Sequence, residues 1–169
     1  TGAFETLHAF RKGPAEGQYP MGRVVVDPDG TVYGTTEYGG GFGKGTVFRW
    51  TPPSGGGVGG TLTTVYSFGA SNVDAASPYG GLTRTANGLF GTTFFGGSAN
   101  KGTVFRIDNL GAYAVTHSFT GGEDGCHPAV GLTPSRRGGL HGVTSGYNSC
   151  GGPSARGTVF LLDASGAAP

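Results

Sequence analysis

The chain has 169 residues, of which 37 are glycine and only 12% are charged, and its net charge is +1 at pH 7. Without a basic cluster, this composition excludes the dense positive surface that nucleic-acid binding requires, and no apolar run is long enough to span a bilayer. Aromatic residues make up 11% of the chain and recur at regular intervals, which argues against disorder. We therefore expect an all-β fold with its glycines in turns.

Three repeats follow one another, at about residues 4–50, 61–107 and 113–163, within a single domain that spans residues 1–169. In chain order, each repeat holds a run that ends in Phe, a run that follows a Pro, a run such as Y-G-T-T, and a G-T-V-F run. Alternation of apolar and small residues favours strands, and D-P-D-G and T-A-N-G are typical of tight hairpin turns. No segment has the period of a helix, so each repeat predicts four strands.

A repeated four-stranded antiparallel unit of about 50 residues is typical of a β-propeller. The order of the runs resembles blades of the NHL type, with the run after the Pro as strand A, then B, then G-T-V-F as C and the Phe-ended run as D. On this assignment the chain begins with a D strand, Phe4–Phe10, and ends with a C strand, Gly157–Asp163. We expect three blades, with the N-terminal strand completing the C-terminal blade of its own chain or of a neighbour.

Three blades are fewer than the usual range of about four to eight, and an unpaired strand edge is a liability. We therefore expect the chain to have itself as a partner. Two copies joined head to tail by strand exchange would close a six-bladed ring, whereas a rotation that does not close would give a filament. A fragment of a longer array is the other interpretation.

The motif G-(L/V)-(Y/F)-G-T-T, followed by G-G, G-T-V-F and S-F, resembles the GloVer, or Gloeo-Verruco, repeat over nearly the whole chain. The resemblance implies bacterial tandem repeats outside the cell or on its surface, and it supplies no catalytic residues. The third repeat departs from the pattern, because His141 replaces Tyr33 and Phe90, and Val143 replaces the first Thr. We expect this repeat to differ in role from the other two.

Two cysteines, Cys126 and Cys150, lie in the D–A and B–C loops of the third repeat. An even cysteine count with few charges fits a secreted protein with one disulfide, and these two loops share one face of a propeller. The disulfide is expected to be structural. No metal site or cofactor is predicted, since the histidines lack a ligand spacing with the cysteines. The chain begins without Met or a visible signal peptide, so we expect a processed product. The cysteine count and the family resemblance together lead us to expect an extracellular or cell-surface protein.

Function tends to lie on long, varied loops of a rigid scaffold. An aromatic ring beside a polar or charged group is how many proteins bind sugars, and repetition around a ring would add avidity. The candidate ligand-binding residues are Tyr19, Tyr38, Lys44, Tyr79, Phe95, Lys101, His127, Tyr147 and Arg156. The alternative is that the aromatic residues pack between blades and that the cations are solvated.

The first hypothesis is therefore a non-catalytic propeller that binds carbohydrate or another extracellular ligand. The second is a structural protein that assembles by strand exchange. The third is an enzyme acting on polysaccharide, for which Glu16, Asp74 and Asp124 in comparable D–A loops are the candidate acids. Glycoside hydrolysis needs two facing carboxylates, which the sequence does not place, so no catalytic residue is predicted.

Overall fold

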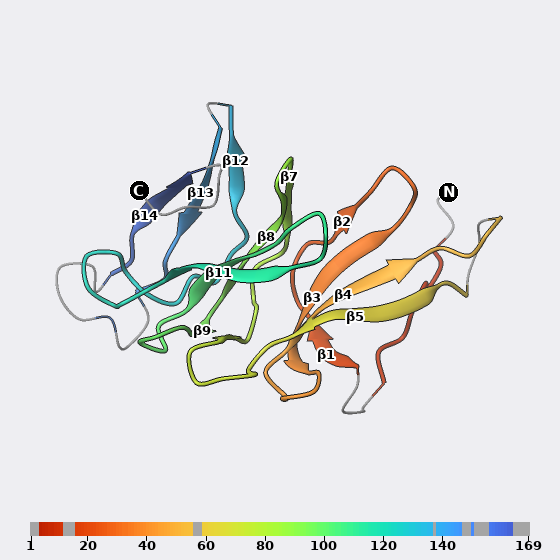
Figure 1. The fold of residues 1–169 in the computed structure, drawn as a ribbon, viewed down its shortest axis with the longest axis horizontal. Helices are drawn as coiled ribbons and strands as arrows, with labels where there is room; N and C mark the ends of the chain where they lie inside the picture. Colours follow the sequence, from red (N-terminus) through yellow and green to blue (C-terminus); the bar gives the residue numbers. More distant parts are fainter. Residues whose placement is uncertain are drawn as a thin grey trace.

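The computed structural model describes residues 4–11, 16–55, 59–136, 138–146, 150 and 156–163. These residues form strands and loops without a helix, as the sequence predicts. Three antiparallel sheets follow one another along the chain and lie side by side, as Figure 1 shows from orange through green to blue.

Sheet 1 contains β1 (Gly17–Pro20), β2 (Val25–Val26), β3 (Val32–Gly39), β4 (Thr46–Thr51) and β5 (Thr61–Ser67). Both short strands, β1 and β2, pair with β3, so that together they take the place of one interrupted strand A. Strands β4 and β5 complete the sheet in the expected C and D positions.

Sheet 2 contains β7 (Thr83–Thr85), β8 (Gly88–Thr93), β10 (Thr103–Ile107) and β11 (Tyr113–Ser118). It has the four-stranded order β7-β8-β10-β11. A separate pair, β6 (Ala75–Ala76) and β9 (Phe95–Gly96), stands where β1 pairs with β3 in sheet 1.

Within the described residues, sheet 3 has only β12 (Thr133–Ser135), β13 (Gly139–Val143) and β14 (Val159–Asp163), with β14 at its edge. The expected N-terminal strand, Phe4–Phe10, does not form here. In the described part of the chain no strand pairs with this segment, and a strand needs a hydrogen-bonded neighbour. The segment and β14 lie at opposite ends of the molecule (Figure 1).

The repeated motif has a packing reason, because the glycine of each Y-G-T-T-like run lies directly across the ladder from the phenylalanine of a G-T-V-F run. The three pairs are Gly34 and Phe48, Gly91 and Phe105, and Gly142 and Phe160. A Cβ atom on any of these glycines would overlap the ring opposite. Only glycine therefore leaves room for a phenylalanine to lie flat over the strand.

Buried threonine pairs form a second repeated contact between the same two strands. The hydroxyl groups of Thr36 and Thr46 are 2.8 Å apart, and those of Thr93 and Thr103 are also 2.8 Å apart. Thr144 and Thr158 repeat the contact at 2.9 Å in the third repeat. Such cross-strand pairs fix the register and satisfy hydroxyl groups that are shielded from water.

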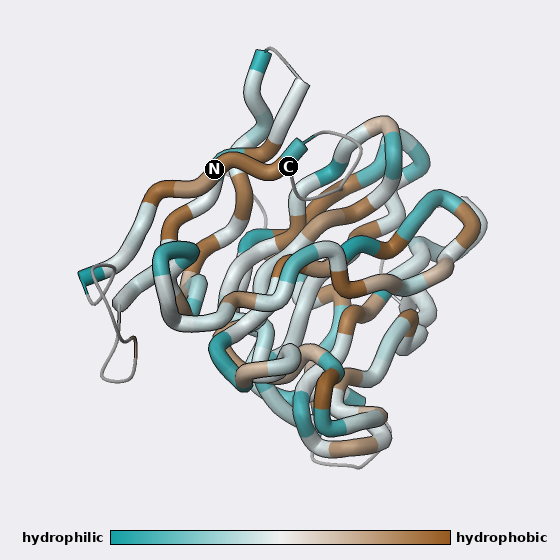
Figure 2. The backbone as a smooth tube through the Cα atoms, turned by 60° about the vertical axis from the view of Figure 1, so that its left-hand side comes forward, coloured by the Kyte–Doolittle hydropathy of each residue, from teal (hydrophilic) through white to brown (hydrophobic). Residues whose placement is uncertain are grey.

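Two apolar clusters fill the spaces between neighbouring sheets. In Figure 2, hydrophobic stretches of neighbouring segments lie beside one another, and several of the outer turns are hydrophilic. The Phe that follows each D strand packs on the next sheet. The rings of Phe68 and Phe105 are 5.0 Å apart, and those of Phe119 and Phe160 are 5.2 Å apart. Phe10 makes the same contact with Phe48, at 5.1 Å, although no strand precedes it.

The glycine that opens each G-T-V-F run is needed where the next sheet approaches. Gly45 and Gly102 have φ angles of 98° and 96°, which favour glycine. Their ideal Cβ positions would lie 2.7 Å from the rings of Pro78 and Pro128 in the following sheet. These contacts, with the Phe contacts, define a junction that occurs twice, between sheets 1 and 2 and between sheets 2 and 3.

Candidate functional site

The first candidate residues, Tyr19 and Tyr38, form an exposed aromatic pair at one end of sheet 1. Tyr19 lies in β1 and Tyr38 at the end of β3, and the register of these two strands brings the rings within 6.0 Å in an edge-to-face arrangement. The two residues are 64% and 44% exposed. Their rings therefore offer apolar surface to solvent next to two phenol groups.

The ring contacts continue onto the neighbouring sheets, where Tyr79 and Phe94 are half-buried and His127 is buried. The hydroxyl group of Tyr79 donates a hydrogen bond of 2.7 Å to Glu37, the residue before Tyr38. The Tyr79 ring lies 5.2 Å from Phe94, which stacks on His127 at 4.6 Å.

Phe95 completes the group, with its ring 4.9 Å from Phe94 and 5.4 Å from His127. We call this group the aromatic row, and it comprises Tyr19, Tyr38, Tyr79, Phe94, Phe95 and His127, with Glu37 joining Tyr38 to Tyr79. It runs from sheet 1 to the loop that leads into sheet 3.

Glu37 determines the electrostatics of the row. Hydrogen bonding to Glu37 raises the pKa of Tyr38, and together with burial it raises the pKa of Tyr79 to about 12. Both phenols are protonated at neutral pH, as phenols ordinarily are, and act as hydrogen-bond donors to Glu37. The carboxylate of Glu37 is buried, so these donors are held in fixed positions.

Backbone geometry fixes the inner members of the row. Tyr19, Ser77 and His127 occupy equivalent positions before a proline, and all three have left-handed φ angles between 53° and 57°. This conformation is uncommon for residues other than glycine. In sheets 2 and 3 it is held by the preceding sheet, because the amides of Ser77 and His127 donate to the carbonyls of Lys44 and Lys101.

The predicted cations do not join the aromatic row. The side chain of Lys44 lies against Gly69, and that of Lys101 lies against Gly121, in each case over the loop that follows a D strand. Arg156 is exposed, and Tyr147 lies outside the described residues. Of the nine predicted ligand-binding residues, the structure thus brings together Tyr19, Tyr38, Tyr79, Phe95 and His127.

The loop acids cap their own loops. Glu16, Asp74 and Asp124 accept hydrogen bonds from the amides of Arg11, Gly69 and Thr120, respectively. In each loop the aromatic or imidazole side chain two residues before the Phe also approaches the acid, as His8, Tyr66 and His117. The three acids therefore hold three separate loops in one conformation.

The pKa values of the capping acids agree with this structural role. Burial raises the pKa of Asp74, but hydrogen bonds from Tyr113, Ala70, Gly69 and Tyr66 outweigh it and leave the pKa below its ordinary value. Asp124 behaves in the same way through Thr120 and His117. A general acid for glycoside hydrolysis needs a raised pKa instead.

The predicted disulfide between Cys126 and Cys150 is confirmed, with Cα atoms 5.8 Å apart. It joins the two loops of the third repeat that were expected on one face. Among the described residues no group of His, Cys, Asp and Glu could hold a metal ion. The described part of the chain also contains no helix long and apolar enough to cross a membrane.

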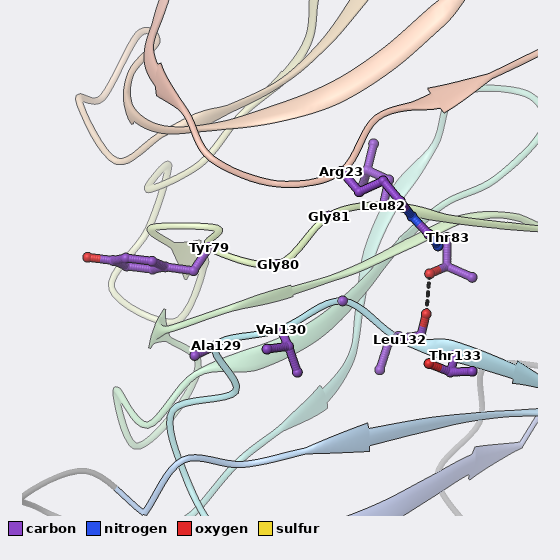
Figure 3. A pocket seen from close by; sticks show the side chains of 11 residues that line it. Arg23, Tyr79, Gly80, Gly81, Leu82, Thr83, Ala129, Val130, Leu132 and Thr133 are labelled. Carbon is purple, nitrogen blue, oxygen red and sulfur yellow. Dashed lines mark hydrogen bonds between the residues drawn. The ribbon is translucent and has the colours of Figure 1, made fainter.

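A hollow of about 320 Å³ lies where the three sheets begin. Figure 3 shows segments from all three sheets around it, with Arg23 from sheet 1, residues 79–83 from sheet 2 and residues 129–133 from sheet 3. Its wall is largely backbone, and Thr83 donates across it to the carbonyl of Leu132. Besides Arg23, the polar side chains at this hollow are those of Tyr79, Thr83 and Thr133.

Sequence reasoning missed two members of the site, Glu37 and Phe94. Both adjoin predicted residues in the chain, Tyr38 and Phe95. In a strand, neighbouring side chains point to opposite faces, so adjacency alone did not predict that Phe94 would join Tyr79 and His127. That contact depends on how two sheets pack.

Comparison with known proteins gives one match. The model of the Gloeobacter/Verrucomicrobia repeat matches residues 1–168, which is almost the whole chain. Searches of the curated proteins and of the solved structures found no match. The repeated Gly–Phe and Thr–Thr contacts described above give a physical reason for the spacing of this motif. The chain therefore belongs to the Gloeobacter/Verrucomicrobia repeat family.

Proposed function

We propose that this chain is a secreted, non-catalytic protein whose three sheets are β-propeller blades and whose aromatic row binds carbohydrate. The observation that carries the proposal is the exposed pair of Tyr19 and Tyr38, with rings 6.0 Å apart beside the Glu37 carboxylate. A sugar ring has an apolar face that packs on aromatic surface and hydroxyl groups that hydrogen-bond to polar side chains such as phenols.

The blade interpretation is supported by the repeated junction. Each sheet packs on the next through the same Phe–Phe and Gly–Pro contacts, and the segments that lead into β2, β7 and β12 line a shared hollow. In a propeller, the innermost strands surround a central channel in this way. The disulfide is compatible with the oxidising conditions outside the cell.

The test is binding of the 169-residue chain to a glycan array and to insoluble polysaccharides, followed by titration with the best ligand. Tyr38→Ala and Phe95→Ala are each expected to weaken binding about tenfold, which corresponds to about 1.4 kcal/mol. Both changes remove a ring that is at least 40% exposed, so the fold should be retained.

Leu110→Ala is the matched control, because Leu110 is an apolar residue that is 95% exposed in a turn outside the aromatic row. It is expected to bind like the wild type. The proposal is wrong if no glycan binds, or if Leu110→Ala weakens binding as much as Tyr38→Ala does.

A second function, structural self-assembly, is favoured by the position of β14 at the edge of sheet 3 and by residues 4–11, with which no strand pairs in the described part of the chain. It is compatible with carbohydrate binding, since assembly would multiply the aromatic rows. The hypothesis of a polysaccharide-degrading enzyme has weaker support, because Glu16, Asp74 and Asp124 are occupied in capping their loops.

A further inference from the structure

An apolar hollow of about 220 Å³ lies beside β14, at the junction between sheets 2 and 3. It is lined by Val104, His117, Phe119, Asp124, Phe160, Leu161 and Leu162. The hollow is open at the edge of sheet 3, where a fourth strand would lie if sheet 3 were completed like sheet 2.

At the equivalent place between sheets 1 and 2, the ring of Tyr113 fills the space. Tyr113 belongs to β11, the fourth strand of sheet 2, and it stacks on Tyr66 with ring centres 3.6 Å apart. It also lies 5.9 Å from Phe68, and its hydroxyl donates to Asp74 at 2.7 Å. The hollow beside β14 is thus the position of Tyr113 in the third repeat.

The repeat itself identifies the residue that would occupy this position. Tyr113 lies six residues before Phe119, and Phe4 lies six residues before Phe10. Phe4 is 94% exposed, and no strand pairs with residues 4–11 in the described part of the chain. Phe4 is therefore a large apolar side chain without apolar surroundings, and the hollow is an apolar site without an aromatic ring.

We propose that residues 4–10 of a second copy of this chain add to β14 as the fourth strand of sheet 3, with Phe4 in the hollow. The registers of β4 with β5 and of β10 with β11 define the pairing. By equivalence, the pairs are Val159 with His8, Phe160 with Thr6, Leu161 with Glu5, and Leu162 with Phe4.

The polar groups at the hollow suit a phenylalanine. Asp74, between sheets 1 and 2, accepts the hydroxyl groups of both Tyr66 and Tyr113. Its equivalent, Asp124, instead accepts from the hydroxyl and the amide of Thr120 and contacts His117. Both carboxylate oxygens of Asp124 therefore already have hydrogen-bond partners, and a ring at this position does not need a hydroxyl group.

The residues around the hollow and those near the N-terminus also correspond to the two sides of a closed junction. Val159 and Leu161 of β14 are 80% and 57% exposed, whereas Val47 and Val104, the equivalents of Val159, are fully buried by a following sheet. Gly157 has a φ angle of 100°, like the glycines that receive Pro78 and Pro128. Pro20, which would reach Gly157 from the second copy, is exposed.

The occupant is a second copy because the two partners lie at opposite ends of one chain. Residues 4–11 pack on sheet 1 through Phe10 and Phe48, while β14 forms the far edge of sheet 3 (Figure 1). The contact is therefore head to tail. Two copies give a ring if the rotation closes, and more copies give an open chain if it does not.

The first test is the mass in solution of the 169-residue chain, measured by sedimentation over a range of concentrations. The wild type is expected at a multiple of the 16.9 kDa chain mass. Phe4→Asp places a charge in the apolar hollow and should raise the concentration needed for assembly by at least about a hundredfold. Leu110→Asp, at an equally exposed apolar residue away from β14, should assemble like the wild type.

The second test fixes the register. Glu5→Cys and Leu161→Cys variants are mixed and oxidised, and a cross-linked pair of chains is expected. Thr6→Cys replaces Glu5→Cys as the control, because neighbouring strand residues face opposite sides and it should not cross-link to Leu161→Cys. Wild type that stays monomeric overturns the proposal, and so does equal cross-linking of the Glu5→Cys and Thr6→Cys variants. A double variant that carries both Glu5→Cys and Leu161→Cys provides a further check, and cross-linking only within one chain of it would also overturn the proposal.

Discussion

The closed junctions between neighbouring sheets and the two open faces at the ends of the array are built from equivalent residues with opposite exposure. Leu82 and Leu132, near the start of sheets 2 and 3, are almost fully buried, whereas their equivalent Val24 in sheet 1 is 45% exposed. On the other side, Val104 is fully buried and Val159 is 80% exposed. Burial in this protein is therefore determined by the neighbouring sheet more than by the strand that carries the residue.

The residues of the third repeat that depart from the repeat motif lie on the open face of sheet 3, where Val159 is exposed. Tyr33 and Phe90 pack against the sheet that follows theirs, in the first and second apolar clusters, respectively. Their equivalent, His141, is exposed because no sheet covers it in the described part of the chain. The different role expected for the third repeat is still a prediction, and its residues on this face are those that would meet a second copy.

The largest expected difference between a closed junction and an open end is at the repeated phenylalanines. Phe68→Ala should lower the free energy of unfolding by about 3–5 kcal/mol, because Phe68 is fully buried between Phe105 and Tyr113. Phe10→Ala should cost less than about 2 kcal/mol in the monomer, because Phe10 is only half-buried. Urea unfolding measures both, and equal losses would contradict the comparison.

The next largest difference is expected between the stability losses caused by replacing two of the capping acids. Asp74→Ala should cost about 3 kcal/mol, since it strands the hydroxyl groups of Tyr66 and Tyr113 and the amide of Gly69. Glu16→Ala should cost less than about 1 kcal/mol, because Glu16 accepts an exposed hydrogen bond. Thermal or urea unfolding at neutral pH compares the two variants.

The pH dependence of stability gives a further check on Asp74. Its folded-state pKa is below the ordinary value of 3.8, so its contribution is complete at neutral pH and is lost as the pH falls below about 4. The Asp74→Ala variant should lose less stability than the wild type over this acid range. Parallel curves for the two proteins would show that Asp74 does not carry the effect.

The smallest expected effect concerns a single hydroxyl at the junction. Thr92 donates to the carbonyl of Val130 in the next sheet at 2.9 Å, and Thr35 donates to Gly80 in the same way. Thr92→Val should lower the free energy of unfolding by about 1 kcal/mol. The equivalent residue in the third repeat is already a valine, Val143. Val143→Thr should therefore leave the stability of the monomer unchanged, as urea unfolding would show.

Much of the fold could be predicted because the strand and turn signals are short sequence patterns that recur in each repeat. The three G-T-V-F runs became β4, β10 and β14, and the D-type runs of the second and third repeats became β5 and β11. The disulfide was also predicted, because the repeat assignment placed both cysteines in neighbouring loops. By contrast, Asp27 was predicted only as a turn residue, yet it accepts two hydrogen bonds from Arg84 of the next sheet.

The same distinction between local pattern and contacts across sheets applies to the candidate site. The sequence alone determined where most strand-like runs fall, because the repeat has a fixed period. It was wrong at the edges of the loops, since Tyr19, Tyr38 and Phe95 were expected in loops and lie in β1, β3 and β9. Only the tertiary structure decided that five predicted residues form one aromatic row, that the lysines lie elsewhere, and that an apolar hollow lies opposite an exposed Phe4. The reason is physical: strand period is a local property of the chain, whereas these contacts join residues of different sheets, and only packing brings them together.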